Sequence, residues 1–419
     1  MTRRRKWLLI AGVIAIMGLV LLLLLRAALQ PQRVTRLLLD RAGRALGLEI
    51  SARGVSDYRL RGTPMLVVRD VVAREPGAPK PVLRAERIYL SLPWSTLRAR
   101  GADLTVERVE LDAPVLDLPA LQQWLATRPP GESRVPTLTD GLHVTNGTLV
   151  NRTWSIDAID IDMPTLAPGQ PVNARVRARY LDPPRRVNAN LAVALSQPAS
   201  HAGFAAIGPV NVSSDDWSLP ANLKLSGPLR IDDGVVRIAP ARLAMAARYK
   251  SATTEIPFAL GVFGPLQFKD SVWAWAPVGL GLRGEDRVPN LAARGALALG
   301  RALVIDLDGT IPVWPVAWPA LPPPLSASTS RLSFGVRYTG KADLTGVAAL
   351  QLRRDATRFA GRLRVFDVSS WMGAKPPGSP VPPLDGVLTT PVLKISGAQL
   401  DGVEITFDDP DIPALEPAP

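Results

Sequence analysis

The sequence predicts a mainly β protein with one transmembrane helix at its N-terminus and few other helices, all of them short. Three observations lead to this fold class. Apolar and polar residues alternate in many separate segments, which is the pattern of strands with one apolar face. The 419-residue chain contains 41 Pro and 33 Gly, and this much proline disfavours long helices. Residues 7–25 form one apolar run without a charged residue.

The apolar run from Trp7 to Leu25 is long enough to cross a bilayer and longer than the apolar core of a signal peptide. We therefore predict an uncleaved signal anchor over residues 7–25. The basic segment 1–6 precedes the anchor and favours a cytoplasmic N-terminus. The bulk of the chain is then expected on the other side of a membrane that it spans once.

The segment after the anchor has the pattern of an amphipathic helix that ends near Gly47, with Leu37, Leu38 and Leu46 on its apolar face. Two interpretations of its basic face stay open. The arginines face solvent while the helix caps a sheet, or they lie at lipid headgroups on a membrane surface. These candidate membrane-surface residues are Arg33, Arg36, Arg41 and Arg44.

Alternation dominates from residue 50 onward. In GADLTVERVELDAPVLDL, residues 101–118, the parity of the apolar residues switches around Ala113 and Pro114, which predicts a bulge. Other alternating segments lie at 87–94, 159–163, 172–180, 187–195, 332–338, 359–365 and 403–407. Residues 118–126 are the one clearly helical pattern here. The Pro-rich segments 311–324 and 376–383 are predicted loops, and 408–419 is a predicted acidic, disordered tail.

Two architectures fit this alternation. A sandwich or barrel buries the apolar face against another sheet, whereas one long, curved, mostly antiparallel sheet leaves it lining a groove. The sequence has no strict repeat, which disfavours a propeller or a leucine-rich solenoid. Periodicity alone does not separate the two architectures.

Catalytic chemistry has little support in the sequence. The chain contains no Cys and only two His, and the familiar hydrolase and nucleotide motifs are absent. The glycines at 279, 281 and 284 match a dinucleotide-binding spacing, but Pro289 follows where a helix is needed. Asp160 and Asp162 are interpreted as solvent-facing charges. We expect no enzyme activity, no cofactor and no metal site.

The charge distribution argues against nucleic acid as a partner. The net charge is +12, but residues 1–44 hold nine basic residues and one acidic residue, which gives +8 at the membrane end alone. No dense basic cluster with interleaved aromatic residues occurs in the rest of the chain.

Three features resemble the AsmA family of bacterial envelope proteins. The first is the order of a basic N-terminus, one span and a helix that ends in ALGLEI. The second is the segment 82–125, which contains a strand, a short turn at 97–101 and then the pattern of Val109, Leu111, Pro114, Leu116 and Leu118. The third is LTTPVLKISGAQLDGVEITFDD at 388–409.

This resemblance implies an inner-membrane anchor followed by an elongated, curved periplasmic β-sheet that forms an apolar groove. Residues 26–127 are then the AsmA-like N-terminal region, and residues 128–407 the β-rich groove. The expected function is binding of phospholipid acyl chains, with transfer along the groove as its extension, in outer-membrane biogenesis. The lipid-groove candidates are Leu90, Leu92, Val109, Leu111, Leu116, Leu118, Val176, Leu191, Val193, Phe334, Val336, Leu363, Val403 and Ile405.

A second function also stays open. The arrangement of one span followed by a β-rich chain is similar to the anchored N component of type II secretion. The chain is then a periplasmic scaffold for outer-membrane or secretion components, with an envelope protein as its partner.

Overall fold

The computed structural model describes two compact units, residues 1–190 and 191–419, and the division falls inside one strand. The predicted boundary at residues 127 and 128 does not coincide with this division. The described residues are 39–413, apart from 41–42, 45, 55–56, 60, 99–103, 128–134, 233, 319, 322, 374–381 and 396. The predicted anchor at 7–25 lies outside them. Within these described ranges, no helix is long and apolar enough to span a membrane.

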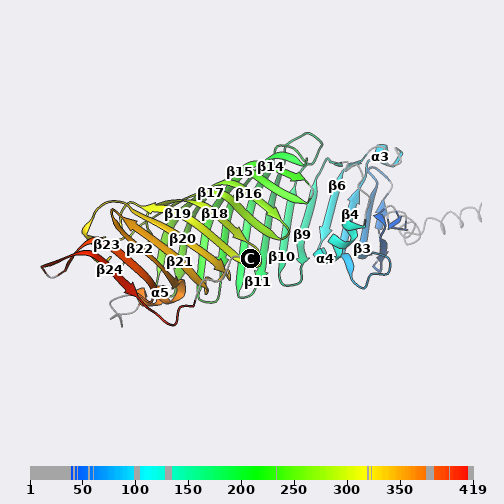
Figure 1. Cartoon of the computed structure of the whole chain (residues 1–419). Helices are drawn as coiled ribbons and strands as arrows, with labels where there is room; N and C mark the ends of the chain where they lie inside the picture. The colour runs from blue at the N-terminus through cyan, green and yellow to red at the C-terminus, as the bar shows by residue number, and fades with distance from the viewer. Residues whose placement is uncertain are drawn as a thin grey trace, which may run out of the picture. The chain divides into compact units, whose positions relative to one another are not determined.

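The described part of unit 1 contains short and medium strands, with the short helices α3 and α4 among them (Figure 1). Its elements are β1 (Glu49–Ala52), β2 (Asp57–Arg59), β3 (Met65–Arg74), β4 (Pro81–Ser91), α3 (Trp94–Arg98), β5 (Thr105–Val106), β6 (Arg108–Asp112), β7 (Val115–Asp117), α4 (Leu118–Ala126), β8 (Thr137–Leu138), β9 (Leu142–Val150), β10 (Ser155–Met163) and β11 (Val172–Asp182). The strand that contains the division is β12 (Arg185–Leu195).

Unit 2 has longer strands, which run antiparallel in chain order. They are β13 (His201–Ser213), β14 (Trp217–Asp232), β15 (Val235–Ser251), β16 (Glu255–Lys269), β17 (Val272–Gly284), β18 (Leu291–Leu299), β19 (Leu303–Ile311), β20 (Leu332–Gly340), β21 (Val347–Arg354), β22 (Thr357–Arg364), β23 (Asp385–Ile395) and β24 (Ala398–Phe407). The 3-10 turn η1 (Leu325–Ala327) precedes β20, and the helix α5 (Val365–Gly373) follows β22.

Most strands belong to one sheet of 22 strands, and nearly all described pairs are antiparallel. The parallel pairs are β6 with β9, β7 with β9, and the small separate pair of β5 with β8. The prediction of a mainly β protein with one long, mostly antiparallel sheet and few short helices is confirmed for the described residues.

The parity switch in segment 101–118 is a bend in the backbone. Ala113 has a φ of 45° between β6 and β7, as the bulge prediction required. Before the bend, Leu111 is paired with Ile88, and after it Leu116 is paired with Leu83. The predicted helix at 118–126 is also present as α4, because Asp117 caps its start by accepting from the Ala120 N–H at 2.9 Å.

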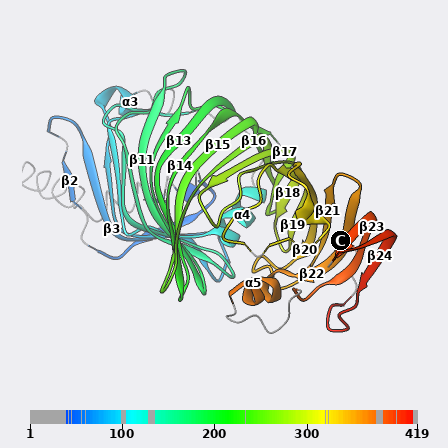
Figure 2. The same cartoon turned by 90° about the vertical axis from the view of Figure 1, so that its left-hand side faces the viewer.

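A line of bulges bends the long strands of unit 2 (Figure 2). The register shifts between Ile238 and Ala241 on β15, and between Trp275 and Val278 on β17. On β16, between these two strands, Gly264 has a φ of 142°, and a Cβ there would lie 2.2 Å from the Pro277 carbonyl oxygen. Only glycine fits this close approach, which gives the sheet its curvature without breaking the ladder.

Several finer predictions are corrected by the structure. Leu92 follows the end of β4, where its N–H donates to the Pro64 carbonyl, and Trp94 begins α3 with 42% of its surface exposed, so the alternation ends earlier than predicted. Leu118 is in α4 and not in a strand. The predicted disordered tail does not start at residue 408, because Ile412 is 7% exposed and Pro413 accepts from Arg362. The loop predicted at 311–324 begins one residue later, since Ile311 ends β19.

Candidate functional site: the apolar face of unit 2

One face of the sheet in unit 2 carries an unbroken row of apolar side chains and glycine. The printed registers connect one residue from each strand from β13 to β24 directly to its neighbour on the next strand. In order they are Ala206, Leu225, Leu243, Val262, Leu280, Ala293, Gly309, Phe334, Leu352, Phe359, Leu388 and Ile405. We call the side of the sheet that carries this row the apolar face.

The row one residue away points to the opposite side of the sheet, because side chains alternate along a strand. Its members are Ile207, Lys224, Ala244, Gly261, Gly281, Ala292, Thr310, Ser333, Arg353, Arg358, Thr389 and Glu404. Apart from Ile207 this row is small, polar or charged. The two faces therefore differ along the whole ladder, which is the pattern of a sheet with one face in water.

The apolar face is not packed against a second sheet in the described part of unit 2. Several of its central residues, such as Leu243, Leu260 and Leu280, are only half-buried, whereas Val262 and Val278 are 6% and 2% exposed. The buried cluster of Ile238, Ala241 and Leu266 packs with residues of neighbouring strands alone. A facing sheet would bury these side chains fully, as in sandwiches. A single curved sheet thus fits unit 2 better than a sandwich.

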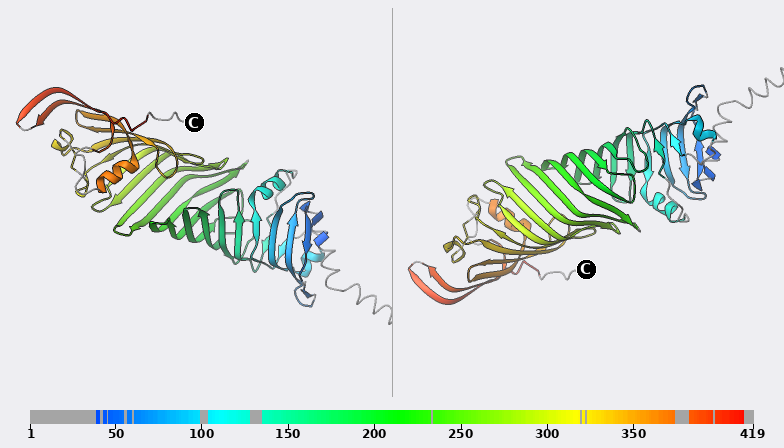
Figure 3. Two further views of the ribbon diagram at one scale, coloured as in Figure 1. Left: turned by 90° about the horizontal axis from the view of Figure 1, so that it is seen from below. Right: turned by 90° about the horizontal axis from the view of Figure 1, so that it is seen from above.

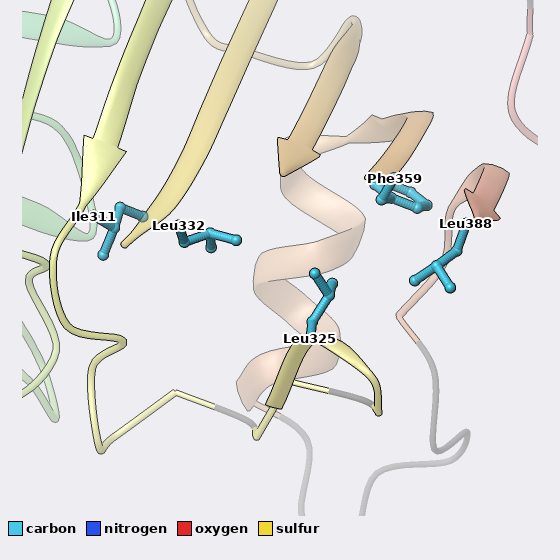
Figure 4. Packing of buried hydrophobic residues seen from close by; sticks show 5 residues of the cluster. All are labelled: Ile311, Leu325, Leu332, Phe359 and Leu388. Atoms are coloured by element: carbon cyan, nitrogen blue, oxygen red, sulfur yellow. The ribbon is translucent and has the colours of Figure 1, made fainter. Parts of the chain in front are cut away.

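The end of the apolar face over β19 to β24 is covered by the loop 312–331. Leu325 of this loop is 3% exposed and packs with Ile311, Leu332, Phe359 and Leu388 (Figure 4). The helix α5 runs beside the same cluster (Figure 4). This covered end is the largest buried cluster in unit 2, whereas the face over β13 to β18 has no such cover among the described residues.

The uncovered part has an aromatic margin. Trp273 on β17 faces Leu299 on β18, and their exposed fractions are 47% and 45%. The Phe268 ring lies 4.6 Å from the Trp273 ring, centroid to centroid. Trp275 is fixed in place because its indole N–H donates to the Gly264 carbonyl at 3.1 Å. Large apolar side chains that are this exposed form a hydrophobic surface patch.

A small polar cluster interrupts the apolar face at the tip of the β21–β22 hairpin. Arg354 is paired with Thr357, and their exposed fractions are 6% and 7%. The Thr357 hydroxyl lies 3.1 Å from that of Thr390, which donates to the Val392 carbonyl at 3.1 Å. The Arg354 Nη1 donates to the Leu325 carbonyl at 2.8 Å, but its buried Nε has no hydrogen-bond partner.

Unit 1 has its own apolar row on the strands before the bend. Each residue in this row is paired with the next one across neighbouring strands. The row runs from Val68 through Ile88, Leu111, Val144 and Ile161 to Val176. Their neighbours on the other side of the sheet are charged and partnered. The partnered groups include Arg87 with Glu110 and Asp112, and Asp162 with His143.

Two hydrogen-bonded ion pairs of this sheet, Arg87 with Asp112 and Arg179 with Asp157, shift the pKa of one or both of their members. The hydrogen bond that Arg87 donates to Asp112 raises the pKa of Arg87, and the one that Arg179 donates to Asp157 lowers the pKa of Asp157. Asp160 accepts from the Asn146 N–H at 2.9 Å. Asp160 and Asp162 of β10 thus each bond a group of the neighbouring strand β9.

Most lipid-groove candidates lie on these apolar rows. Phe334, Val336, Leu363, Val403 and Ile405 are on the apolar face of unit 2, since their cross-strand partners belong to it. Leu191 and Val193 are half-buried members of β12. Those of unit 1 are on paired strands, except for Leu92 and Leu118, which lie outside any strand. The unit 1 set on strands is Leu90, Val109, Leu111, Leu116 and Val176.

The candidate membrane-surface arginines are only partly within the structure. Arg33, Arg36 and Arg41 lie outside the described residues. Arg44 is exposed, its Nε donates to the Asp40 carbonyl at 3.3 Å, and the chain turns at Gly47 with a φ of 59°, where the helix was predicted to end.

Polar side chains that sequence reasoning missed are those of the cluster at Arg354. The sequence shows three arginines in RRDATR at 353–358, but alternation alone places Arg354 on the apolar side and gives no reason to expect a charge there. Among the described residues, no group of three or more His, Cys, Asp or Glu is arranged to hold a metal ion. The glycines at 279, 281 and 284 belong to β17, as a strand and not as a nucleotide loop.

Comparison with known proteins adds no family. No protein-family model, no curated protein and no solved structure matches this chain.

Proposed function

We propose that this protein binds the acyl chains of phospholipids on the apolar face of unit 2. The observation that carries this proposal is the unbroken row from Ala206 to Ile405, in which Leu225, Leu243 and Leu280 stay half-buried without a covering layer among the described residues. A surface of this kind needs an apolar partner, because burying one methylene is worth about 0.8 kcal/mol. Ten methylenes would contribute about 8 kcal/mol, which lies within the range of the cost of association.

The same proposal includes the place of the protein. The sequence of residues 1–25 supports an anchor in the inner membrane with the rest of the chain in the periplasm, and lipid is then available at the anchored end. Because the apolar row has no polar stop between β13 and β20, a bound chain has no single preferred position along it. This supports transfer along the face, and with it a role in outer-membrane biogenesis, as the extension of the proposal.

The test uses photo-crosslinking in the full-length protein, purified in mild detergent from cells. Photoreactive residues at Val262 and Leu280 point to the apolar face, and the matched controls Gly261 and Gly281 are their sequence neighbours on the opposite face. We expect phospholipid adducts at the first pair only, identified by mass spectrometry. Equal labelling at all four positions, or no lipid at any of them, would refute the proposal.

A scaffold function is the second candidate, and the C-terminal hairpin favours it. β24 follows β23 at the end of the ladder in unit 2 (Figure 3), and Leu400 on β24 is 51% exposed. A strand at the end of a ladder offers backbone groups for an added strand of another protein. Protein adducts in place of lipid adducts at Val262 and Leu280, together with crosslinks from Leu400 to the same protein, would support this function.

A further inference from the structure

The buried charge of Arg354 lacks a counter-ion in direct contact. Its side chain is 6% exposed, and no ion pair within 4 Å involves it among the described residues. Arg108 also has a buried Nε without a hydrogen bond, but that atom lies 2.7 Å from a Glu110 oxygen. The Nε of Arg354 has no such neighbour. A buried guanidinium left partly unsatisfied is costly, and an anion that accepts from Nε would relieve the cost.

The groups around Arg354 do not fill this need. The hydroxyls of Thr357 and Thr390 bond to each other and to the Val392 carbonyl. Asp355 is the nearest acidic residue in the chain, and hydrogen bonds from Ser328 and Ser330 lower its pKa more than Arg354 does. Its carboxylate is exposed and turned to these serines, so water screens its charge. The Arg354 Nε therefore has no acceptor on the apolar side of the sheet, where it is buried beneath the loop that contains Leu325.

The position of Arg354 relates it to the apolar face. Along β21, the residues that share its side are Leu350 and Leu352, both members of the apolar face. Residues two apart on a strand lie about 7 Å apart, so an apolar chain that replaces part of the loop's packing on Leu350 and Leu352 would bring its end to Arg354. Arg353 and Arg358 lie on the opposite face of the same hairpin and add positive potential nearby.

We propose that Arg354 binds the anionic headgroup, a phosphate or a carboxylate, of an amphiphile whose apolar chain lies on the neighbouring apolar face. This inference rests on the proposed function and adds the chemical class of the headgroup. A planar guanidinium presents Nε and Nη donors as a fork that suits two oxygens of one anion. Because Nη1 already donates to the Leu325 carbonyl and Nε has no acceptor, the anion would accept the hydrogen bond that the protein leaves unmade at Nε.

The test compares two photoreactive probes that share a dodecyl chain with a diazirine, one ending in a phosphate monoester and the other in an alcohol. Full-length protein in mild detergent is titrated with each probe, and labelled peptides of β20 to β22 are quantified. We expect half-saturation by the phosphate probe at a concentration at least about tenfold lower than by the alcohol, since bonds to charged groups are stronger than neutral ones.

Arg354→Met is the decisive variant, because replacing a buried charge with an apolar side chain of similar size often leaves stability unchanged or higher. We expect the ratio of the two half-saturating concentrations to fall to about one, with the alcohol probe unaffected. Arg354→Lys retains a charge without the fork and should give an intermediate ratio. Arg353→Met, on the other face of the hairpin, should keep the wild-type ratio.

The outcomes separate this inference from the proposed function. If wild-type protein binds both probes equally well, or if Arg354→Met weakens both equally, the headgroup assignment fails while lipid binding stands. If inorganic phosphate at the same concentration displaces the phosphate probe, the site takes free phosphate and the assignment also fails. If neither probe labels the apolar face, the proposed function itself fails.

Discussion

The ring of Phe334 lies over Gly309 on the neighbouring strand. The two residues are directly paired between β19 and β20, and a Cβ added at Gly309 would lie 2.6 Å from the ring Cζ. The ring thus occupies the space of the missing side chain and keeps the apolar row continuous. Phe359 covers Gly361 in the same way on β22. Aromatic cover of a strand glycine explains why Gly309 does not interrupt the face.

Replacing Gly309 tests this relationship. Gly309→Ala forces the Phe334 ring aside and also meets the Ala292 carbonyl oxygen at 2.5 Å. We expect a loss of about 1–3 kcal/mol in the free energy of unfolding, the usual cost of overpacking, measured by chemical denaturation. Gly281→Ala is the matched control, since a Cβ there meets nothing within 4 Å. Equal stability of the two variants would show that the ring moves freely.

Gly264 gives a second test, through the backbone. Its φ of 142° is in a region that side chains rarely adopt, and its close approach to the Pro277 carbonyl leaves no room for a Cβ. Gly264→Ala should therefore destabilise the protein by about 1–3 kcal/mol. Amide hydrogen exchange should rise first in β16 and β17, on either side of the bulge. Unchanged exchange there would mean that the bulge does not depend on this glycine.

The pair of Asp157 and Arg179 predicts a pH dependence. Arg179 Nε and Nη2 donate to the two Asp157 oxygens at 2.7 and 2.8 Å, which lowers the pKa of Asp157 from its ordinary value of 3.8. A lowered folded-state pKa contributes stability that is present above the unfolded value and is lost as the pH falls through the folded one. The contribution is thus present above the unfolded pKa of about 4 and is lost progressively at lower pH, as the carboxylate becomes protonated in the folded protein as well.

Arg179→Gln should then destabilise the protein at neutral pH and leave it less changed in acid, below the folded pKa of Asp157. Thermal melts from pH 7 down to about pH 2 measure the difference between variant and wild type. Arg177→Gln, one step along the same side of β11, is the control. A difference that stays constant over this range would show that the ion pair contributes nothing through Asp157.

The sequence predicted the strands better than their bulges and covers. Alternation located β6, β11, β20 and β24 because each has one apolar side, and the switch at Ala113 was visible for the same reason. Alternation wrongly assigned Leu92 and Leu118 to strands, because both residues continue the apolar spacing after the backbone has left the strand. Arg354 was not predicted either. Its burial depends on the loop 312–331, which comes from a distant part of the chain and has no periodic pattern.

The loop 312–331 and the sheet contribute differently to the covered end of the apolar face over β19 to β24. Leu332 on β20 is 0% exposed and Leu325 on the loop is 3% exposed, and both belong to one cluster. Truncating either residue to Ala removes a similar buried volume, with a typical cost of about 2–5 kcal/mol when the whole fold depends on it. A loop, however, can open locally without unfolding the sheet that it covers.

We therefore expect Leu332→Ala to lower the free energy of unfolding by about 2–5 kcal/mol, whereas Leu325→Ala has a smaller effect on global unfolding. In Leu325→Ala, amide hydrogen exchange should rise in residues 325–331 and remain low in β20 and β21. Since Arg354 donates to the Leu325 carbonyl and not to its side chain, that bond should survive the substitution in part. Equal global destabilisation by both variants would mean that the loop and the sheet unfold as one cooperative unit.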